Sequence, residues 1–82
     1  MAYFVYIIKS AKDGKNYIGS TSNLEKRLLW HNQGKNKSTK HRIPFSIIFR
    51  KEFSDKSSAL AYEMWLKKQK GGYKIRELLG GS

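Results

Sequence analysis

The stretch Tyr3–Ser20, YFVYIIKSAKDGKNYIGS, decides the fold because it describes two strands and the turn between them. Tyr3 to Lys9 is aromatic or β-branched at nearly every position, which is typical of a strand covered on both faces. Asp13-Gly14 suits a tight turn, because glycine adopts positive φ angles without strain. Asn16 to Ser20 is the returning strand, so the chain is expected to begin with a β-hairpin.

A helix is expected directly after the hairpin. The sequence from Ser22 to Glu25 matches the capping-box pattern, with Ser22 as the N-cap and Glu25 reaching back to it. The helix should run to about residue 32 or 33, where Gly34 ends it. Lys35 to Ile43 has no apolar period and is expected to be a basic loop.

One more strand and further helices follow. Pro44 can open an edge strand, along which apolar residues alternate with Ser46, Ile48 and Arg50. Ser54 or Asp55 should cap a helix from about residue 56 to 70, and a short third helix is expected at 73–79. The order β-β-α-β-α-α predicts an α+β fold, in which helices pack on a small sheet.

Length and composition limit the class of protein. The chain has 82 residues, enough for one domain, and no cysteine, which fits a reducing, cytoplasmic location. The first residues do not read as a signal peptide, and no stretch approaches the ~18 apolar residues of a membrane span. Residues 80–82 are expected to be a flexible tail or a remnant of expression.

The charge balance points to a polyanionic partner. Seventeen Lys and Arg against six Asp and Glu give a formal net charge of +11. Neutralising phosphates is the commonest use of such an excess. The alternative is a lysine-rich surface that only keeps the protein in solution. Charge alone does not separate DNA, RNA and a membrane surface as partners.

Polar residues interrupt the apolar stripe of the first expected helix. At ~100° per residue, Leu24, Leu28 and His31 fall on one face, with Arg27 beside them. A surface helix normally turns its charged residues outward. Either Arg27 and His31 are ordinary side chains at the edge of the core, or they face a site.

The second expected helix has a similar interruption. Glu63 falls within the narrow arc of Ala59 and Leu66, where an apolar residue is expected. A buried carboxylate needs a cationic partner, because burying it alone is costly. Three partners stay open: Lys67 one turn further along the helix, Arg27 across the core, or a divalent metal ion.

Two tyrosines lie on the paired strands of the hairpin. Tyr6 precedes the Asp13-Gly14 turn and Tyr17 follows it. Their side chains lie close together if the register places them on one face, and a slip of one residue would separate them. Strands are rich in tyrosine, so either residue alone is a weak signal.

These features together resemble the GIY-YIG nuclease family, and its small stand-alone bacterial members most of all. The motifs that carry the resemblance are Val5-Tyr6, Tyr17-Ile18-Gly19, Arg27, His31 and Glu63. The match spans roughly residues 3–79, so residues 1–79 are taken as a single catalytic domain of this kind. Phe4 replaces the glycine of the first motif, and the family's frequent late asparagine has no counterpart after Glu63. Larger relatives add a DNA-binding domain, and no such domain is expected within these 82 residues.

The resemblance implies a three-stranded antiparallel sheet flanked by helices, with the active site on one sheet face. It implies phosphodiester hydrolysis with one divalent ion, Mg²⁺ or Mn²⁺, for which Glu63 would be the single protein ligand. Tyr6 or Tyr17 would help to deprotonate the attacking water; the choice stays open, with Tyr6 preferred. Arg27 would stabilise charge on the phosphate. His31 would orient a tyrosine or bind the phosphate.

Basic residues near these motifs are candidates for holding nucleic acid. The loop after the first helix supplies Lys35, Lys37, Lys40, His41 and Arg42. They would follow the phosphate backbone without reading sequence, or they would only solubilise the loop. Lys67 would contact phosphate or simply pair with Glu63. DNA is the preferred partner and RNA the alternative, with no role for a membrane.

Three functions are compatible with the sequence. The leading hypothesis is a metal-dependent endonuclease that leaves a 5′-phosphate and a 3′-hydroxyl. The first alternative is a nucleic-acid-binding module that keeps the fold without activity, although such a module has no need for the complete residue set. The second is a basic structural protein of a larger assembly, which leaves Glu63 unexplained. The oligomeric state stays open.

Overall fold

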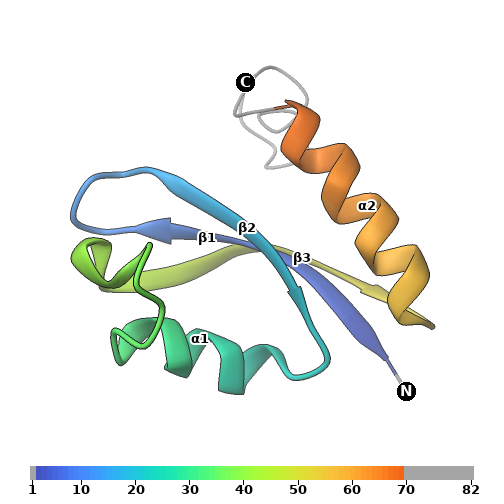
Figure 1. The fold of residues 1–82 in the computed structure, drawn as a ribbon, viewed down its shortest axis with the longest axis horizontal. Coiled ribbons are helices and arrows are strands. Elements are labelled where there is room, and N and C mark those ends of the chain that lie inside the picture. The colour runs from blue at the N-terminus through green and yellow to red at the C-terminus, as the bar shows by residue number, and fades with distance from the viewer. Residues whose placement is uncertain (1, 70–82) are drawn as a thin grey trace.

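Three antiparallel strands form the centre of the molecule. The computed structural model describes residues 2–69 and orders the strands β2-β1-β3 (Figure 1). They are β1 at Tyr3–Ser10, β2 at Asn16–Thr21 and β3 at Phe45–Phe53. Because β1 is central, its consecutive residues Val5 to Ile8 are all buried, as their unbroken apolar run predicts. The prediction of an edge strand after Pro44 is confirmed.

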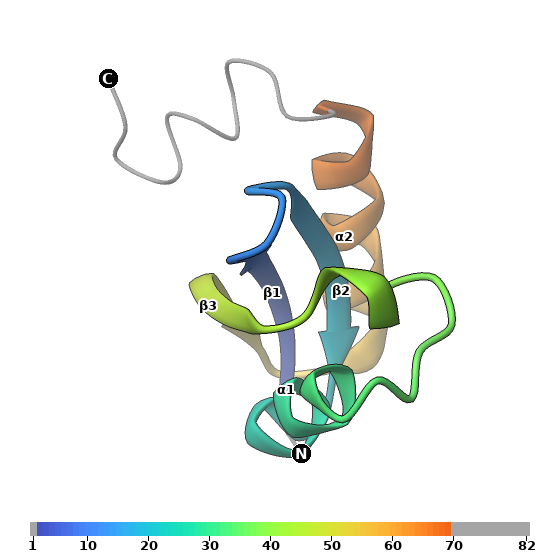
Figure 2. The ribbon, with the colours of Figure 1, turned by 90° about the vertical axis from the view of Figure 1, so that its left-hand side faces the viewer.

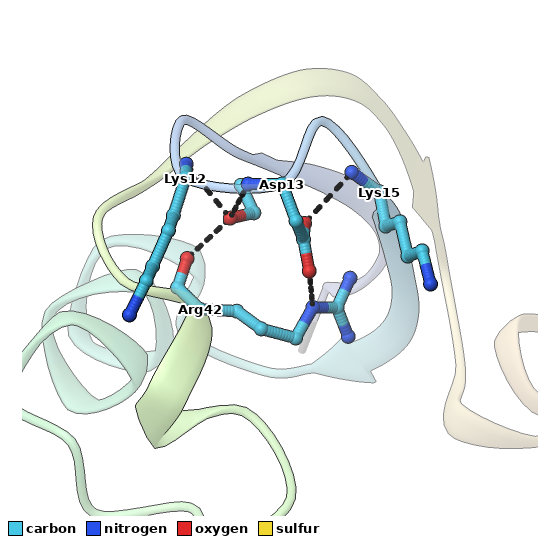
Figure 3. A network of polar contacts seen from close by, with 5 residues as sticks. Lys12, Asp13, Lys15 and Arg42 are labelled. Atoms are coloured by element: carbon cyan, nitrogen blue, oxygen red, sulfur yellow. Dashed lines mark hydrogen bonds and ion pairs between the residues drawn. The ribbon is translucent and has the colours of Figure 1, made fainter.

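The turn between β1 and β2 is fixed by its own polar groups and by the chain before β3 (Figure 3). Gly14 has a φ of 72°, which is the conformation expected for the Asp13-Gly14 turn. The buried Ser10 hydroxyl accepts from the N–H groups of the turn and donates to the Arg42 carbonyl. Arg42 Nε donates to Asp13 Oδ2 at 3.0 Å. These contacts hold the hairpin turn against the segment that leads into β3.

The first helix, α1, runs over Leu24–Asn32. Its N-cap is Asn23, whose Oδ1 accepts from the Lys26 N–H at 3.1 Å. The predicted capping box with Ser22 as N-cap is therefore wrong by one residue, since asparagine caps a helix as well as serine does. The helix ends as expected, because Gly34 adopts a φ of 74° and its N–H donates to the His31 carbonyl.

The segment between α1 and β3 is more ordered than a loop without period suggests. It contains one turn of 3-10 helix, η1, at Lys40–Arg42. The Asn32 amide group also binds both backbone groups of Phe45: Phe45 N–H donates to Oδ1 at 2.6 Å, and Nδ2 donates to the Phe45 carbonyl at 3.1 Å. These two hydrogen bonds connect the end of α1 to the start of β3.

The alternation expected along β3 is present in the burial of its residues through Arg50, but a bulge interrupts the pairing after Ile47. Ile8 pairs with Ile47 and Ile7 with Phe49, so Ile48 is an extra residue in a β-bulge. Phe45 and Ile47 consequently pack toward α1, and Phe49 packs on the opposite face.

The second helix, α2, runs over Lys56–Gln69 on the other side of the sheet from α1 (Figure 1). Asp55 is its cap, since Asp55 Oδ1 accepts from the Ser58 N–H at 2.7 Å. Ala59 and Leu66 of α2 pack on one face of β1, and Leu24 of α1 packs on the other. The β-β-α-β-α order and the α+β class are confirmed. The third helix at 73–79 and the tail lie outside the described residues.

Neither helix in residues 2–69 is long and apolar enough to span a bilayer.

Candidate active site

Tyr6 and His31 meet beneath α1. The Tyr6 hydroxyl lies 3.1 Å from His31 Nε2, and both side chains are buried. The second ring nitrogen, Nδ1, lies 3.1 Å from Thr39 Oγ1, which comes from the loop before β3. His31 occupies the apolar stripe of α1 as the sequence predicts, and each of its nitrogens has a partner.

Tyr17 lies on the same sheet face as Tyr6. The register pairs Tyr6 with Gly19, which places Tyr17 two residues along β2 on the α1 side. The Tyr17 ring centroid is 5.0 Å from that of His31 in an edge-on arrangement. The open question of register is therefore answered: the two tyrosines are neighbours around one histidine.

Gly19 is required by the position of Tyr6. A Cβ atom on Gly19 would lie 2.5 Å from the Tyr6 hydroxyl and 2.7 Å from Cζ. No ordinary side chain fits there, because the Tyr6 ring crosses directly over the backbone of β2 at this point. The last residue of the Tyr17-Ile18-Gly19 motif thus makes room for the tyrosine of the first motif.

Arg27 borders an open groove beside α1. Its guanidinium carbon is 4.8 Å from the centroid of the Trp30 ring, an arrangement that orients the cation. Within residues 2–69, no carboxylate pairs with Arg27. The groove has a volume of about 600 Å³ and is lined by Thr21, Ser22, Asn23, Lys26, Arg27 and Trp30. Its charged side chains are both cations, so it suits an anionic ligand.

Glu63 is half-buried on α2 and bound at both carboxylate oxygens. The Ser20 hydroxyl donates to Oε1 at 2.6 Å, and Lys67 Nζ lies 2.8 Å from Oε2. Of the three partners that the sequence left open, the structure contains Lys67, and it adds Ser20. Lys67 is 56% exposed, so it can move away from the carboxylate.

The oxygen atoms around Glu63 could hold a divalent ion only in a site with few protein ligands. No group of three His, Cys, Asp or Glu side chains in the described part of the chain is placed to hold a metal. A carboxylate with one hydroxyl beside it suits Mg²⁺, which keeps several waters and takes further oxygens from substrate phosphate. The residues present therefore fit an ion held by one carboxylate.

The candidate site residues lie on both faces of the sheet. Glu63 lies on the α2 side, whereas Tyr6 and His31 lie on the α1 side. The expectation of a site on one sheet face is therefore corrected. Because β2 is an edge strand and α2 runs beside it, groups from both faces can meet around that strand (Figure 2).

The pKa values of Tyr6 and His31 shift in opposite directions. Burial raises the pKa of the Tyr6 phenol well above its ordinary value near 10, and Tyr17 raises it further. Arg27 opposes this shift, and the Glu63 carboxylate adds to it. Burial, and then Arg27, lower the pKa of His31 below its ordinary value of 6.5. Both groups are therefore neutral near pH 7, and Glu63 and Arg27 are both close enough to act on Tyr6.

The predicted nucleic-acid residues fall into two groups. The first comprises exposed side chains of the segment after α1, namely Lys35, Lys37, Lys40 and His41. The second comprises cations with a carboxylate partner, Arg42 with Asp13 and Lys67 with Glu63. Arg42 also stacks near the Phe45 ring at 5.7 Å, so its contacts hold the fold together.

Sequence reasoning missed Ser20 and Thr39. Ser20 directly follows the Tyr17-Ile18-Gly19 motif, and the alternation of strand β2 could have placed it on the side opposite to Tyr17. Thr39 gave no signal, since it lies among lysines in a segment without apolar period, and it is only 1% exposed.

Comparison with known proteins agrees with this geometry. The family model described as the GIY-YIG catalytic domain matches residues 2–75. The chain belongs to the GIY-YIG family. It is 42% identical over 66 residues to UPF0213 protein YsiG of Lactococcus lactis, covering 79% of this chain and 62% of that protein. It is 43% identical over 67 residues to UPF0213 protein YazA of Bacillus subtilis, covering 80% and 67% of the two chains.

A solved GIY-YIG relative has a similar fold. It is the solution NMR structure of the UPF0213 protein BH0048 from Bacillus halodurans, with 32% identity and a TM-score of 0.56. The match covers 96% of this chain and 82% of that one. The present GIY-YIG chain spans about two thirds of the length of the Lactococcus relatives that it matches.

Proposed function

We propose that this GIY-YIG protein is a metal-dependent endonuclease that hydrolyses DNA phosphodiester bonds. The observation that carries the proposal is the Tyr6 hydroxyl, which lies over Gly19 of the edge strand β2, 3.1 Å from His31 Nε2, where Arg27 and Glu63 both influence it. RNA is the alternative substrate. A non-catalytic binding module explains the charge of the chain but not this buried arrangement.

Tyr6 moves the proton of the attacking water through His31. Burial raises the pKa of Tyr6, which disfavours a preformed phenolate near pH 7. His31 offers an alternative acceptor, since its lowered pKa keeps Nε2 unprotonated. The water gives its proton to the Tyr6 oxygen while the Tyr6 proton passes to Nε2. Tyr17 packs edge-on against the His31 ring and takes no part in the proposed proton transfer.

Arg27 stabilises the phosphate as the water attacks. The new O–P bond forms while the bond from phosphorus to the 3′ oxygen breaks, which leaves a 5′-phosphate and a 3′-hydroxyl protonated from solvent. The guanidinium has donors to spare, and stacking on Trp30 fixes its plane at the wall of the groove. Donors placed in advance where negative charge develops supply a large share of such catalysis.

Glu63 is the residue that would hold Mg²⁺ or Mn²⁺. When bound, the ion would neutralise phosphate charge as a Lewis acid. Ser20 orients the carboxylate by donating to Oε1, which leaves Oε2 for exchange between Lys67 and the ion.

The basic segment after α1 supplies affinity for the nucleic acid backbone. Lys35, Lys37, Lys40 and His41 are exposed beside the site and have no acidic partner within residues 2–69. Replacing the three lysines by alanine should make the slope of log K against log[salt] shallower by about 2–3, since each phosphate contact contributes ~0.9. The matched control replaces Lys51 and Lys56, which lie near the end of β3 and at the start of α2.

The decisive experiment measures cleavage of supercoiled, branched and single-stranded DNA with Mg²⁺ or Mn²⁺. Arg27→Ala should lower the rate by roughly 10²–10³-fold, as loss of a charge-stabilising donor does. Glu63→Gln should abolish metal-dependent cleavage. Tyr6→Phe should lower the rate by roughly 10²–10⁴-fold, because the proton path is broken.

Each variant has a control of the same chemistry outside the site. Lys56→Ala removes a cation at the first residue of α2, Glu52→Gln removes a carboxylate from β3, and Tyr62→Phe removes a hydroxyl on the α2 side. These three should cut at the wild-type rate. Intact DNA with every substrate, or normal cutting by both Arg27→Ala and Glu63→Gln, would refute the nuclease. Salt-sensitive binding without turnover would then favour the binding module.

A further inference from the structure

Thr39 is a buried residue within an otherwise exposed basic segment. It is 1% exposed, whereas its neighbours Ser38 and Lys40 face solvent. Its backbone is held on both sides: Thr39 N–H donates to the Asn36 carbonyl at 3.1 Å, and the Thr39 carbonyl accepts from the Arg42 N–H at 2.9 Å. The hydroxyl is therefore presented to His31 from a fixed turn.

Among residues 2–69, no polar contact of His31 competes with its two hydrogen-bond partners. The ring is fully buried among the edges of Tyr17, Trp30 and Phe45, with centroids at 5.0, 5.0 and 5.9 Å. The tautomer of the neutral ring is consequently decided by Tyr6 at Nε2 and Thr39 at Nδ1 alone.

Of these two hydroxyls, the phenol is the more acidic and hence the stronger donor. Tyr6 should therefore donate to Nε2. The ring hydrogen then resides on Nδ1 and is donated to Thr39 Oγ1. In either tautomer one hydroxyl hydrogen lacks a partner among the described residues, and the opposite tautomer would leave the better donor, Tyr6, unused while Thr39, the weaker one, donates.

We propose that Thr39 is a positioning residue that holds His31 in the Nδ1–H tautomer and so keeps Nε2 open to the Tyr6 proton. The tautomer follows from the contacts alone, and its catalytic consequence rests on the proposed function. Because Thr39 belongs to the segment that carries Lys37 and Lys40, a nucleic acid bound there holds the same backbone that orients His31. Substrate binding and proton transfer are thereby linked.

The first test is NMR of protein labelled with ¹⁵N in histidine, at pH 8, where long-range ¹H–¹⁵N couplings identify the tautomer. A His41→Gln background leaves only the His31 signals. The wild type should show the Nδ1–H form. Thr39→Val, which keeps the shape but removes the acceptor, should give a measurable population of the Nε2–H form, and Thr39→Ser should restore the Nδ1–H form. An Nε2–H wild type, or an unchanged tautomer in Thr39→Val, would overturn the proposal.

The second test is the rate of DNA cleavage. Thr39→Val should lower kcat roughly 10- to 100-fold with little change in KM, as loss of a partner that orients a histidine does. Thr39→Ser should cut close to the wild-type rate, and so should Ser38→Ala, whose hydroxyl binds only Asn36. Normal cutting by a folded Thr39→Val protein would overturn the positioning role.

The two tests separate the proposals. A protein that cuts no substrate refutes the nuclease, but the NMR result still decides whether Thr39 sets the tautomer. If Thr39→Val does not fold, the wild-type tautomer remains decisive, since an Nε2–H wild type would overturn the proposal.

Discussion

The two faces of the sheet are built from alternate residues of the same strands, yet they are held together differently. On the α2 face, Val5, Ile7 and Leu66 form an apolar core whose buried residues have no polar side-chain atoms. On the α1 face, the buried set includes Tyr6 and His31, joined by a hydrogen bond and closed by aromatic edges.

This difference separates stability from chemistry. Apolar packing tolerates substitution in proportion to the volume removed. A buried polar pair behaves otherwise, because removal of one partner leaves the other unsatisfied. We therefore expect substitutions on the α2 face to change mainly stability, and substitutions on the α1 face to change the site as well. Glu63 is the exception, since it lies on the α2 side but belongs to the site.

The largest loss of stability is expected from Leu66→Ala on the α2 face. Leu66 is fully buried, so its truncation should cost about 2–5 kcal/mol. That is a large share of the roughly 4–12 kcal/mol expected for a domain of this length. Urea unfolding followed by circular dichroism measures the loss, and the remaining folded protein should keep the wild-type tautomer of His31.

The matched control on the same helix is Met64→Ala. Met64 is 62% exposed, and its truncation should change stability by no more than about 0.5 kcal/mol. Equal losses for the two variants would mean that α2 does not pack on the sheet through Leu66.

Gly19→Ala should come next and should damage both stability and the site. The new methyl group would meet the Tyr6 ring, so we expect a loss of about 1–3 kcal/mol from overpacking and separation of Tyr6 from His31. If the proposed proton path is right, cleavage falls as far as in Tyr6→Phe. The measurements are urea unfolding and the His31 NMR signals.

Gly14→Ala is the control, because it replaces the same residue type for a different reason. Gly14 has open space around it but a φ of 72°, so alanine there should cost roughly 1–2 kcal/mol through backbone strain. His31 and cleavage should not change. A Gly19→Ala protein with an intact His31 signal would contradict the steric account of the motif.

The two glycines also show what the sequence could and could not reveal. The Asp13-Gly14 turn could be predicted because its requirement is local: a four-residue turn needs a residue with a positive φ angle. The need for Gly19 is tertiary: it arises from a tyrosine thirteen positions earlier that crosses the strand. Local pattern alone could not supply that reason, and only the resemblance marked Gly19 in advance.

The same division applies to the site. Periodicity placed His31 in the buried stripe of α1 and Glu63 in that of α2, because each helix reports its own faces. It could not tell that the two helices lie on opposite sides of the sheet, and the single face that the family resemblance implied does not hold Glu63 together with Tyr6 and His31. The contacts of Thr39 and Ser20 were not predicted, because short polar residues carry no periodic signal and their partners lie far away in the sequence.

The third prediction concerns pH and is specific to the α1 face. Burial and Arg27 lower the pKa of His31 in the folded protein, so the unfolded chain binds its proton first as the pH falls. Stability from this group is complete above pH 6.5 and declines as the pH falls below it, by at most about 1.4 kcal/mol per pH unit. The groups that face His31 are Tyr17, Arg27 and Tyr6, and the raised pKa of Tyr6 keeps its phenol out of that window.

Urea midpoints at pH 8, 7, 6 and 5 check this prediction. His31→Gln should flatten the dependence, and His41→Gln should leave it intact, because His41 is exposed. The lowered pKa values of Asp13 and Asp55 act only below about pH 4 and stay out of the window. A dependence that survives in His31→Gln would place the titrating group elsewhere.

Lys67→Ala should have the smallest effect on stability. It is also the sharpest test of why a charged residue, Glu63, lies on the apolar α2 face. As an i,i+4 pair whose lysine is exposed, Lys67 and Glu63 should contribute only ~0.2–0.5 kcal/mol. If Glu63 is a metal ligand, Lys67 competes with the ion for Oε2, so Lys67→Ala should bind Mn²⁺ more tightly. The measurement is Mn²⁺-dependent broadening of NMR signals near Ser20, with Glu63→Gln as the variant that binds no ion.

Lys68→Ala is the matched control, since it removes the next charge on α2 from a side chain without a carboxylate partner in residues 2–69. Tighter Mn²⁺ binding only in Lys67→Ala identifies a carboxylate shared between a lysine and an ion. Weaker DNA binding without a change in Mn²⁺ affinity would instead make Lys67 a phosphate contact. If neither changes, the pair is an ordinary feature of the helix surface, and the reason for a carboxylate at position 63 must then lie in its hydrogen bond with Ser20.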